Sequence, residues 1–244
     1  IIFQHIQDIM VCNSSPIIGD SSNNDIKNKF DLLCDLEDEN EDLAELNLVD
    51  YKQIIQSIFE VAISNSFYSE IYATFFKELL EKFSKIVKYI DSLLDYYIKE
   101  YYDNIDTIVV VDSEKNYDQY CQMNKMNDKR KSFSTFITNL TKKQVLPREQ
   151  LFNLIIKLQD KIIEFVDIEG NSHKIDVIIE NLFILITLDI DMLKDSKSDN
   201  SKLVIDNINK FSSYKAKEHK SITSRSIFKL MDIKDVIKKA YGSL

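Results

Sequence analysis

The chain has 244 residues, of which 44% are apolar, enough to build the core of one large domain or two small ones. It contains only 3 Gly and 2 Pro, too few for the tight turns of a β-sandwich or barrel, so the composition favours long helices with short connections. The formal net charge of −9 argues against strong, sequence-independent coating of RNA.

The first 24 residues are predicted to form an N-terminal segment and a linker. Residues 1–12 have the apolar spacing of a short amphipathic helix, and residues 13–24 have the Ser, Asn, Pro and Gly content of a linker. Asp25 can cap a new helix, so we place the main domain at residues 25–244. The apolar face of this first helix comprises Ile26, Phe30, Leu33 and Leu36.

A run of acidic residues overlaps the end of that helix. Residues 31–50 contain nine Asp or Glu and no Lys or Arg. Charge blocks usually face water, so the simplest interpretation is a solvated helix end and loop. The functional alternative is that the run repels nucleic acid or attracts a basic partner.

Residues 49–83 carry the pattern around which the chain is organised, because apolar side chains recur at spacings of three and four in two segments. Asn65 and Ser66 separate the segments, so the pattern predicts a helical hairpin. Neither helix can bury so broad a face alone, so each needs the other and a further layer, as in a stacked helical repeat. The apolar positions are Ile54, Ile55, Ile58, Phe59, Ala62, Ile63, Tyr68, Ile71, Tyr72, Phe75, Phe76, Leu79 and Leu80.

Residues 86–102 keep the helical period and carry five tyrosines. Rings interleaved with lysines can stack on bases, but the few lysines here are matched by acids, so packing in the core is the favoured interpretation. The β-branched run at residues 108–111 indicates an extended loop or a short strand. The conformation of residues 103–116 is left open.

Residues 117–165 are predicted to hold three helices. The first ends near Asn127 and leads into a basic turn, and a short helix over residues 133–140 follows. Pro147 suits the first turn of the third helix, which runs to about Phe165. The cations of the basic turn are Lys129, Arg130 and Lys131.

Residues 174–193 form the most apolar stretch, and Gly170 closes the connection before it. A helix that is apolar nearly all round is expected to be buried between layers. Asp and Glu interrupt the stretch, so it is too short of unbroken apolar sequence to span a membrane.

The last part of the chain is predicted to be a polar loop at residues 194–201, a basic amphipathic helix at residues 202–218 and a helix capped by Thr223. Between Lys194 and Lys239 there are 12 Lys or Arg against 6 Asp or Glu. A solvated lysine face is the simplest interpretation, and contact with an RNA backbone is the functional one. With the basic turn included, the candidate RNA-binding residues are Lys129, Arg130, Lys131, Lys210, Lys215, Lys217, Lys220, Arg225, Lys238 and Lys239.

Paired helices alternate along the chain with a period of roughly 40 residues, which fits repeats of the HEAT class. We therefore expect an all-α, HEAT-type helical-repeat solenoid of about five antiparallel helix pairs.

Three short sequence motifs (called sequence words below), in this order along the chain, resemble motifs of the middle domain of eukaryotic translation initiation factor 4G. The first is an Ile-Phe-Glu-x-Ala-Ile element leading into a Tyr-Ala helix, found here as Ile58, Phe59, Glu60, Ala62, Ile63, Tyr72 and Ala73. The second is a basic cluster, a Phe-Ile-x-x-Leu helix and a turn, found as Lys129, Arg130, Lys131, Phe136, Ile137, Leu140 and Leu146. The third closes the domain as Ser224, Arg225, Phe228, Asp232, Asp235 and Tyr241.

The chain also departs from the family's pattern. The family's final Trp is Tyr241 here, and residues 86–111 look like an insertion. The family's glycines around the Phe-Ile helix are replaced by Phe133, Ser134 and Thr138. The bias toward Ile, Asn and Lys is typical of an AT-rich genome, as in some protists and large DNA viruses.

The resemblance implies a cytoplasmic scaffold, in the host's cytoplasm for a viral protein, that binds a DEAD-box RNA helicase of the initiation factor 4A type. It holds the helicase lobes near their closed arrangement, contacts mRNA weakly, and reaches the cap-binding subunit through regions outside this chain. The implied helicase contacts are Ile26, Phe30 and Leu33 in the first helix and Phe228 and Asp232 in the last, although ordinary core packing would also explain the apolar ones.

Two other functions fit the same pattern. One is a scaffold of the same fold that docks a different RNA helicase in splicing, mRNA decay or ribosome biogenesis. The other is a general protein-interaction solenoid that binds no helicase.

No local pattern indicates catalysis. His5, His173 and His219 are scattered, and no GxxxxGK[ST] or GxGxxG motif occurs. Three cysteines without a CxxC pair indicate neither a disulfide framework nor a zinc site, and they favour a reducing compartment. We expect a non-enzyme with no cofactor, no metal and no membrane contact.

Overall fold

The computed structural model describes residues 47–82, 87–108, 111, 114–194 and 199–241. Every regular element in these residues is helical, and no strand is present among them, so the all-α prediction is confirmed. The predictions for residues 1–46, including the helix that starts at Asp25, lie outside the described residues. The α-helices are α3 (Asn47–Ser64), α4 (Ser69–Lys82), α5 (Val87–Tyr101), α6 (Tyr117–Lys142), α7 (Arg148–Phe165), α8 (Ser172–Thr187), α9 (Asp199–Ser212) and α10 (Ser224–Tyr241).

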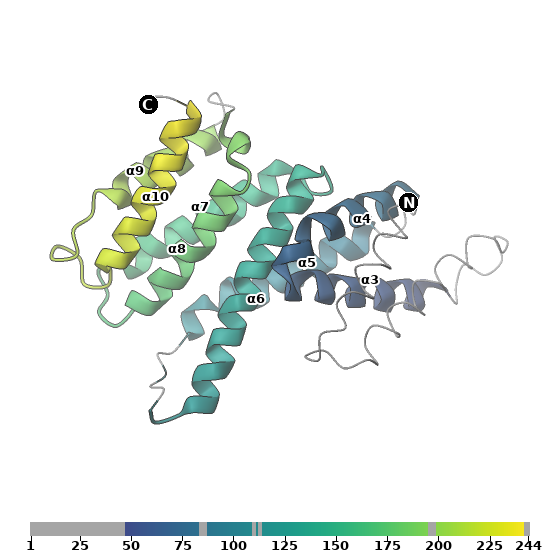
Figure 1. Cartoon of the computed structure of the whole chain (residues 1–244), viewed down its shortest axis with the longest axis horizontal. Helices are drawn as coiled ribbons and strands as arrows, with labels where there is room; N and C mark the ends of the chain where they lie inside the picture. Colours follow the sequence, from purple (N-terminus) through teal and green to yellow (C-terminus); the bar gives the residue numbers. More distant parts are fainter. Residues whose placement is uncertain (1–46, 83–86, 109–110, 112–113, 195–198, 242–244) are drawn as a thin grey trace.

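The predicted helical hairpin is formed by α3 and α4, which are joined by a short 3-10 turn at Ser66–Tyr68. The Asn65 side chain starts this turn by accepting a hydrogen bond from the backbone N–H of Phe67, at 3.0 Å. Both helices pack against α6, which supplies the further layer that the hairpin needed. In Figure 1 the pair crosses α6 at one end of the molecule.

Phe59 lies at the centre of this packing. Its side chain is fully buried and contacts four other rings, with centroid separations between 5.1 and 6.3 Å. These rings come from α4, α5 and α6, so one side chain of the hairpin joins three further helices. They are Phe76, Tyr97, Phe133 and Phe136.

Three of the five tyrosines in residues 86–102 belong to the core, as expected. Tyr97, Tyr101 and Tyr102 are buried, and loss of solvent raises the pKa of Tyr101 to about 12. Tyr96 instead exposes 58% of its surface. A 3-10 helix follows at Asp103–Thr107, and Ile108 and Val111 are in neither helix nor strand.

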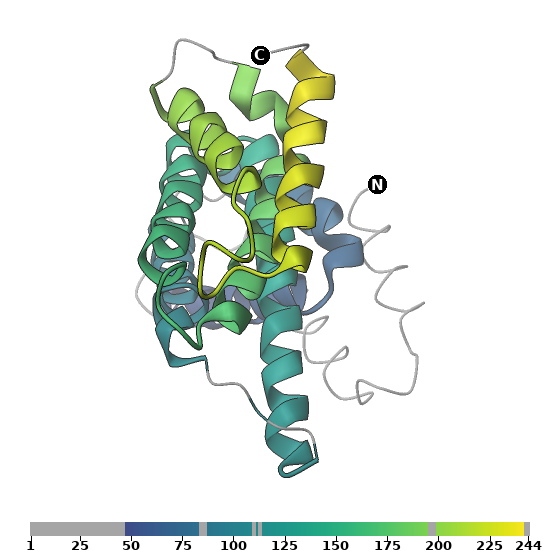
Figure 2. The ribbon, with the colours of Figure 1, turned by 90° about the vertical axis from the view of Figure 1, so that its left-hand side faces the viewer.

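The predicted basic turn at residues 128–131 is wrong, because α6 runs unbroken from Tyr117 to Lys142. Gly and Pro are the residues that most often end a helix, and neither occurs within this range. The cluster of charged residues was not enough to end the helix. The two halves of α6 differ sharply. No residue from 117 to 129 is buried, whereas residues 130–141 are all buried apart from Lys131 and Thr135. Figures 1 and 2 show the N-terminal half projecting beyond the other helices.

The C-terminal part of the chain is arranged in two layers. Helix α8 packs between α6 and α10, and α7 and α9 cover the other side (Figure 1). The prediction that residues 174–193 are buried between layers is only partly right, because α8 is covered on one side and lines the surface with Glu180, Phe183 and Ile184 on the other. Helix α8 also ends at Thr187, and a 3-10 helix occupies Ile190–Lys194. The helix predicted at residues 202–218 is shorter, because α9 ends at Ser212.

The predicted helix boundaries near α7 and α10 are confirmed. Pro147 precedes the first residue of α7, which ends at Phe165. Gly170 adopts a positive φ of 89° in the connection to α8, a conformation that glycine reaches without steric cost. Thr223 caps α10, since its hydroxyl oxygen accepts the backbone N–H of Ser226 at 3.0 Å.

A network of buried hydrogen bonds joins Tyr102, the residue after α5, to α6 and α8. The Ser134 hydroxyl donates to the Asn181 side-chain oxygen at 2.7 Å, so the Tyr102 hydroxyl, 2.5 Å from Ser134, must be the donor to it. The Asn181 amide in turn donates to the backbone oxygen of Val177 at 2.7 Å. The side chains of this hydrogen-bond network are therefore hydrogen-bonded to one another or to the backbone, and the network needs no water molecule.

Truncating Phe59 to Ala is expected to destabilise the fold by about 3–5 kcal/mol, because it removes the ring shared by four helices and leaves a cavity. Phe67→Ala is the matched control, since Phe67 is 83% exposed at the hairpin tip and should change stability by no more than about 0.5 kcal/mol. Denaturant unfolding followed by circular dichroism measures both. Similar costs for the two variants would contradict the central position of Phe59.

Candidate functional site

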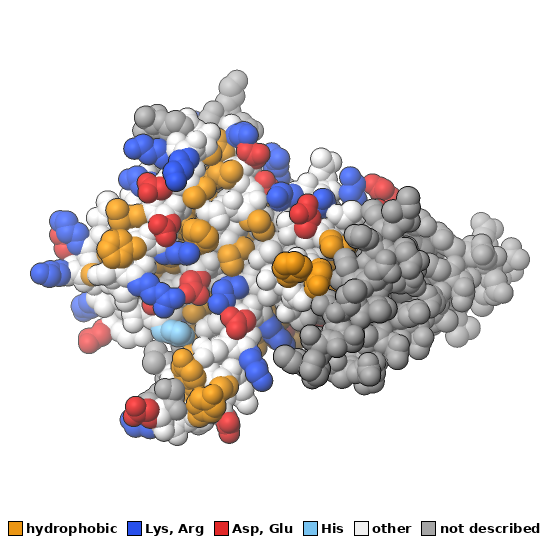
Figure 3. Space-filling model, viewed as in Figure 1, with side chains coloured by type: hydrophobic (Ala, Val, Ile, Leu, Met, Phe, Trp, Pro, Cys, Tyr) orange, Lys and Arg blue, Asp and Glu red, His pale blue; other side chains and the backbone are white. Residues whose placement is uncertain are grey.

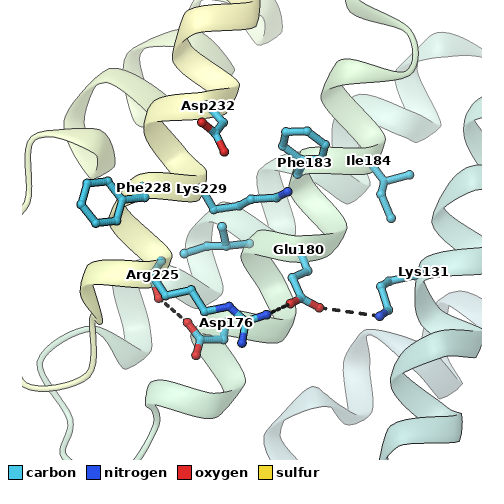
Figure 4. Close-up of a pocket in the computed structure, with 11 residues that line it drawn as sticks. Lys131, Asp176, Glu180, Phe183, Ile184, Arg225, Phe228, Lys229 and Asp232 are labelled. Atoms are coloured by element: carbon cyan, nitrogen blue, oxygen red, sulfur yellow. Dashed lines mark hydrogen bonds and ion pairs between the residues drawn. The ribbon is translucent and has the colours of Figure 1, made fainter.

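The exposed face of α6, α8 and α10 holds a groove of about 680 Å³. Its apolar surface comes from Ile179, Phe183 and Ile184 of α8 and from Phe228 of α10. Figure 4 shows α8 in the middle, with the α10 side chains on one side and Lys131 of α6 on the other. The groove therefore lies across three helices that are distant in sequence.

Glu180 holds cations from both neighbouring helices. One of its carboxylate oxygens lies 2.6 Å from Nη2 of Arg225, and the other lies 3.9 Å from Nζ of Lys131 (Figure 4). Lys131 also pairs with Asp128 at 2.8 Å. Lys229, the third cation of the groove, places its Nζ 3.6 Å from the centroid of the Phe183 ring, a cation–π contact. Each groove cation thus already has a protein partner.

Two carboxylates of the groove have no cationic partner among the described residues. Asp176 accepts hydrogen bonds from the Ser226 and Thr223 hydroxyls but forms no ion pair among the described residues. Asp232, exposed on α10 at the rim of the groove, also has no ion-pair partner in the part of the chain that the structure describes. The groove therefore keeps two carboxylates without a cation.

Phe228 and Asp232, both predicted as contact residues, lie together on this groove. Phe228 exposes 65% of its surface, so the alternative that it is an ordinary core residue is wrong. The two side chains are one helical turn apart on α10 (Figure 4). The other three predicted contacts, Ile26, Phe30 and Leu33, lie outside the described residues.

A second hollow of about 580 Å³ adjoins the groove and shares Lys131, Asp176, Glu180 and Arg225 with it. Its far wall is the projecting half of α6, which contributes Tyr120, Met123 and Asn124 among others. His173 also lines it, and the buried Nε2 of that ring has no hydrogen-bond partner among the described residues. Figure 3 shows this face, with apolar side chains on either side of a band of mixed charge.

The predicted RNA-binding residues do not gather in one patch. The expectation for Arg130 is corrected, because its side chain is only 5% exposed and donates to the backbone oxygen of Tyr101 and to Asn127. Lys131 and Arg225 are paired with Glu180. The exposed candidates are Lys129, Lys210, Lys215, Lys217, Lys220, Arg225, Lys238 and Lys239.

Helix geometry separates these exposed lysines further. Lys215, Lys217 and Lys220 lie in the connection before α10, whereas Lys238 and Lys239 lie in its last turn, about 20 Å away along the axis at 1.5 Å per residue. Lys215 pairs with Glu218 at 2.8 Å. Among these candidates, three exposed lysines lie in the connection between α9 and α10.

Sequence reasoning missed Glu180, Phe183 and Lys229, which complete the groove. The available signal was that Asp176 and Glu180 stand four residues apart within a stretch that is otherwise apolar. That spacing places both carboxylates on one face of the helix and so marks the face that reaches solvent.

The described residues contain no group of three or more His, Cys, Asp or Glu positioned to hold a metal ion. His219 contacts Asp167 at 2.8 Å and packs on the Tyr214 ring, with no nucleophile in this contact. None of the helices that the structure describes has the length and apolar content to cross a membrane.

Comparisons of the chain with protein-family models, with curated proteins and with solved structures find no match. The resemblance to the middle domain of initiation factor 4G therefore rests on the three sequence words alone.

Asp189 is the most deeply buried carboxyl among the residues that the structure describes. It lies just after α8, only 8% exposed, and one of its oxygens has no hydrogen-bond partner among the described residues. Burial raises the pKa of this carboxyl even though Arg148 and Lys142 lie close enough to oppose the shift. The charged form is thus less favourable in the folded chain than in the unfolded one.

This shift predicts how stability depends on pH. Because the pKa of Asp189 is raised, the folded chain keeps a proton that the unfolded chain releases near pH 3.9. The contribution of Asp189 to the free energy of unfolding therefore falls as the pH rises through the raised pKa. Asp189→Asn should therefore raise the unfolding midpoint at pH 7 and change it little near pH 3.5.

Asp191→Asn provides the control, because its exposed carboxylate pairs with Lys194 at 2.5 Å and its pKa is lowered. That variant should be slightly less stable than the wild type at pH 7. Thermal unfolding at both pH values distinguishes the two, and the same sign for both would contradict the account of Asp189.

Proposed function

We propose that this chain is a translation-initiation scaffold that binds and activates a DEAD-box RNA helicase of the initiation factor 4A type. The three sequence words, in their order, support the proposal. The layering of α6, α8 and α10 over α7 and α9 is compatible with HEAT-type repeats, which we propose continue through residues 25–244 as about five helix pairs. In this proposal the catalysis belongs to the helicase, and the scaffold needs no cofactor.

The exposure of Phe228 carries the proposal. A phenylalanine that is 65% exposed beside an unpaired carboxylate has the composition of a binding hot spot rather than of a solvated surface. The resemblance assigns a helicase contact to this position and to Asp232. Burial of the ring by a partner would recover the free energy that its exposure to water costs.

The scaffold would act by population shift. A protein that contacts both helicase lobes favours their closed arrangement by the difference between its affinities for the closed and open forms. We propose that one lobe binds at Ile26, Phe30 and Leu33 and the other at Phe228 and Asp232. The cap-binding subunit would bind outside this chain, and the complex would work in the cytoplasm.

The test is the RNA-dependent ATPase rate of an initiation factor 4A type helicase with and without the chain. Stimulation is expected, and Phe228→Ala should weaken helicase binding about tenfold or more, because hot-spot aromatics contribute at least about 1–2 kcal/mol. Met231→Ala is the matched control, since Met231 is 46% exposed on the same helix and does not line the groove.

If neither binding nor stimulation occurs, the proposal fails for this helicase. Pull-down against helicases of splicing, mRNA decay and ribosome biogenesis then identifies a scaffold of the same fold with a different helicase. A chain that retains none of them would be a general interaction solenoid.

Weak contact with mRNA is a second part of the proposal, supported by the exposed lysines between α9 and α10. Lys217→Glu combined with Lys220→Glu should weaken RNA binding. The affinity of the wild type should fall steeply with salt, because each phosphate contact on a single strand adds about −0.7 to the slope of log association constant against log salt concentration. Lys202→Glu, an exposed change on α9, is the control. An affinity that does not change with salt would remove RNA from the proposal.

A further inference from the structure

The groove and its neighbouring hollow adjoin, and we call the two together the channel. Four residues line both, and three of them, Lys131, Glu180 and Arg225, form the ion-paired bridge between the two parts. Apolar side chains lie beyond this bridge on each side. Phe183 and Phe228 lie at one end, and Tyr120 and Met123 lie at the other.

The dimensions of the channel fit a short peptide segment. The wall provided by α6 runs from Tyr120 to Lys131, about 16 Å of helix axis at 1.5 Å per residue, and the Phe228 end extends beyond it. A helix of three to four turns has this length, and its apolar positions recur often enough to reach both apolar ends.

The charges that line the channel favour a bound segment of positive net charge. Its cations are occupied, because Lys131 and Arg225 are bound by Glu180 and Lys229 lies on the Phe183 ring. Asp176 and Asp232 have no cation among the described residues. An anionic segment would compete with Glu180 for Lys131 and Arg225 and would face two carboxylates without a cation, whereas a cationic segment would supply the missing partners.

We propose that this channel binds a basic, amphipathic segment of a partner protein. One apolar side chain of the segment lies against Phe183 and Phe228, a second lies near Tyr120 and Met123, and Lys or Arg side chains pair with Asp232 and Asp176. The inference rests on the proposed scaffold function in that it assigns the chemistry of a docked partner to the same face. Single-stranded RNA fits the channel poorly, since its phosphates would face these two carboxylates.

The test is selection from a display library of random 16-residue peptides on the immobilised chain, with counter-selection on Phe228→Ala. We expect the selected peptides to combine Lys or Arg with apolar residues at spacings of three and four. Acidic peptides, no enriched peptide, or peptides that bind Phe228→Ala as well as the wild type would each overturn the proposal.

Fluorescence anisotropy with the best selected peptide then tests the contacts. Phe228→Ala and Asp232→Lys should each weaken binding about tenfold or more, and Met231→Ala should leave it unchanged, with circular dichroism confirming that each variant is folded. Loss of affinity in Phe228→Ala alone, with Asp232→Lys unaffected, would overturn the charge assignment. Displacement of the peptide by a 20-nucleotide oligouridine at moderate salt would identify RNA as the occupant instead.

Helicase stimulation is measured on the same variants, so that the two proposals fail separately. Peptide binding without helicase stimulation would leave the channel in place and refute the helicase assignment. Stimulation that is lost in Phe228→Ala, without selection of basic peptides, would retain the scaffold and refute the peptide channel.

Discussion

The burial of the C-terminal half of α6 is the constraint on which the other layers depend. This half lies against α3 and α4 on one side and α8 on the other, so the N-terminal hairpin and the C-terminal layers share one central helix. Phe133 and Phe136 of this half meet Phe59 of the hairpin, and Ser134 faces Asn181 of α8. The free N-terminal half of the same helix can then project and form one wall of the channel, because the buried half anchors it.

The charge of the groove depends on one carboxylate that is shared across three helices. Glu180 of α8 lies between Lys131 of α6 and Arg225 of α10, and Asp128 also pairs with Lys131, so carboxylates balance both cations. A surface whose cations are already paired with carboxylates has little preference for anionic ligands, whatever the number of lysines in the chain. The local excess of basic residues in the last 50 residues is therefore a misleading guide to the character of this face.

Periodicity predicted most of the fold, since apolar spacing reports burial directly. It located the hairpin, α7, α8 and α10, while Asn65 marked the turn within the hairpin and Thr223 marked the start of α10. It failed at residues 128–131, where charge suggested a turn but tertiary packing of Phe133 and Phe136 kept the helix continuous. Spacing cannot show which helices become neighbours, so it named Phe228 and Asp232 but not the α8 side chains opposite them.

The buried Ser134 hydroxyl has a mechanical consequence, because it takes part in two hydrogen bonds between elements. Contacts between helices that are held by apolar packing alone have no preferred direction, because the hydrophobic effect is non-directional. The hydrogen-bond chain from Tyr102 through Ser134 to Asn181 crosses such contacts with directional bonds, which resist sliding more strongly than apolar packing does. Sliding of α6 along α8 would break these buried bonds and leave polar groups unpaired, so the register between the two helices is held by hydrogen bonding as well as by shape.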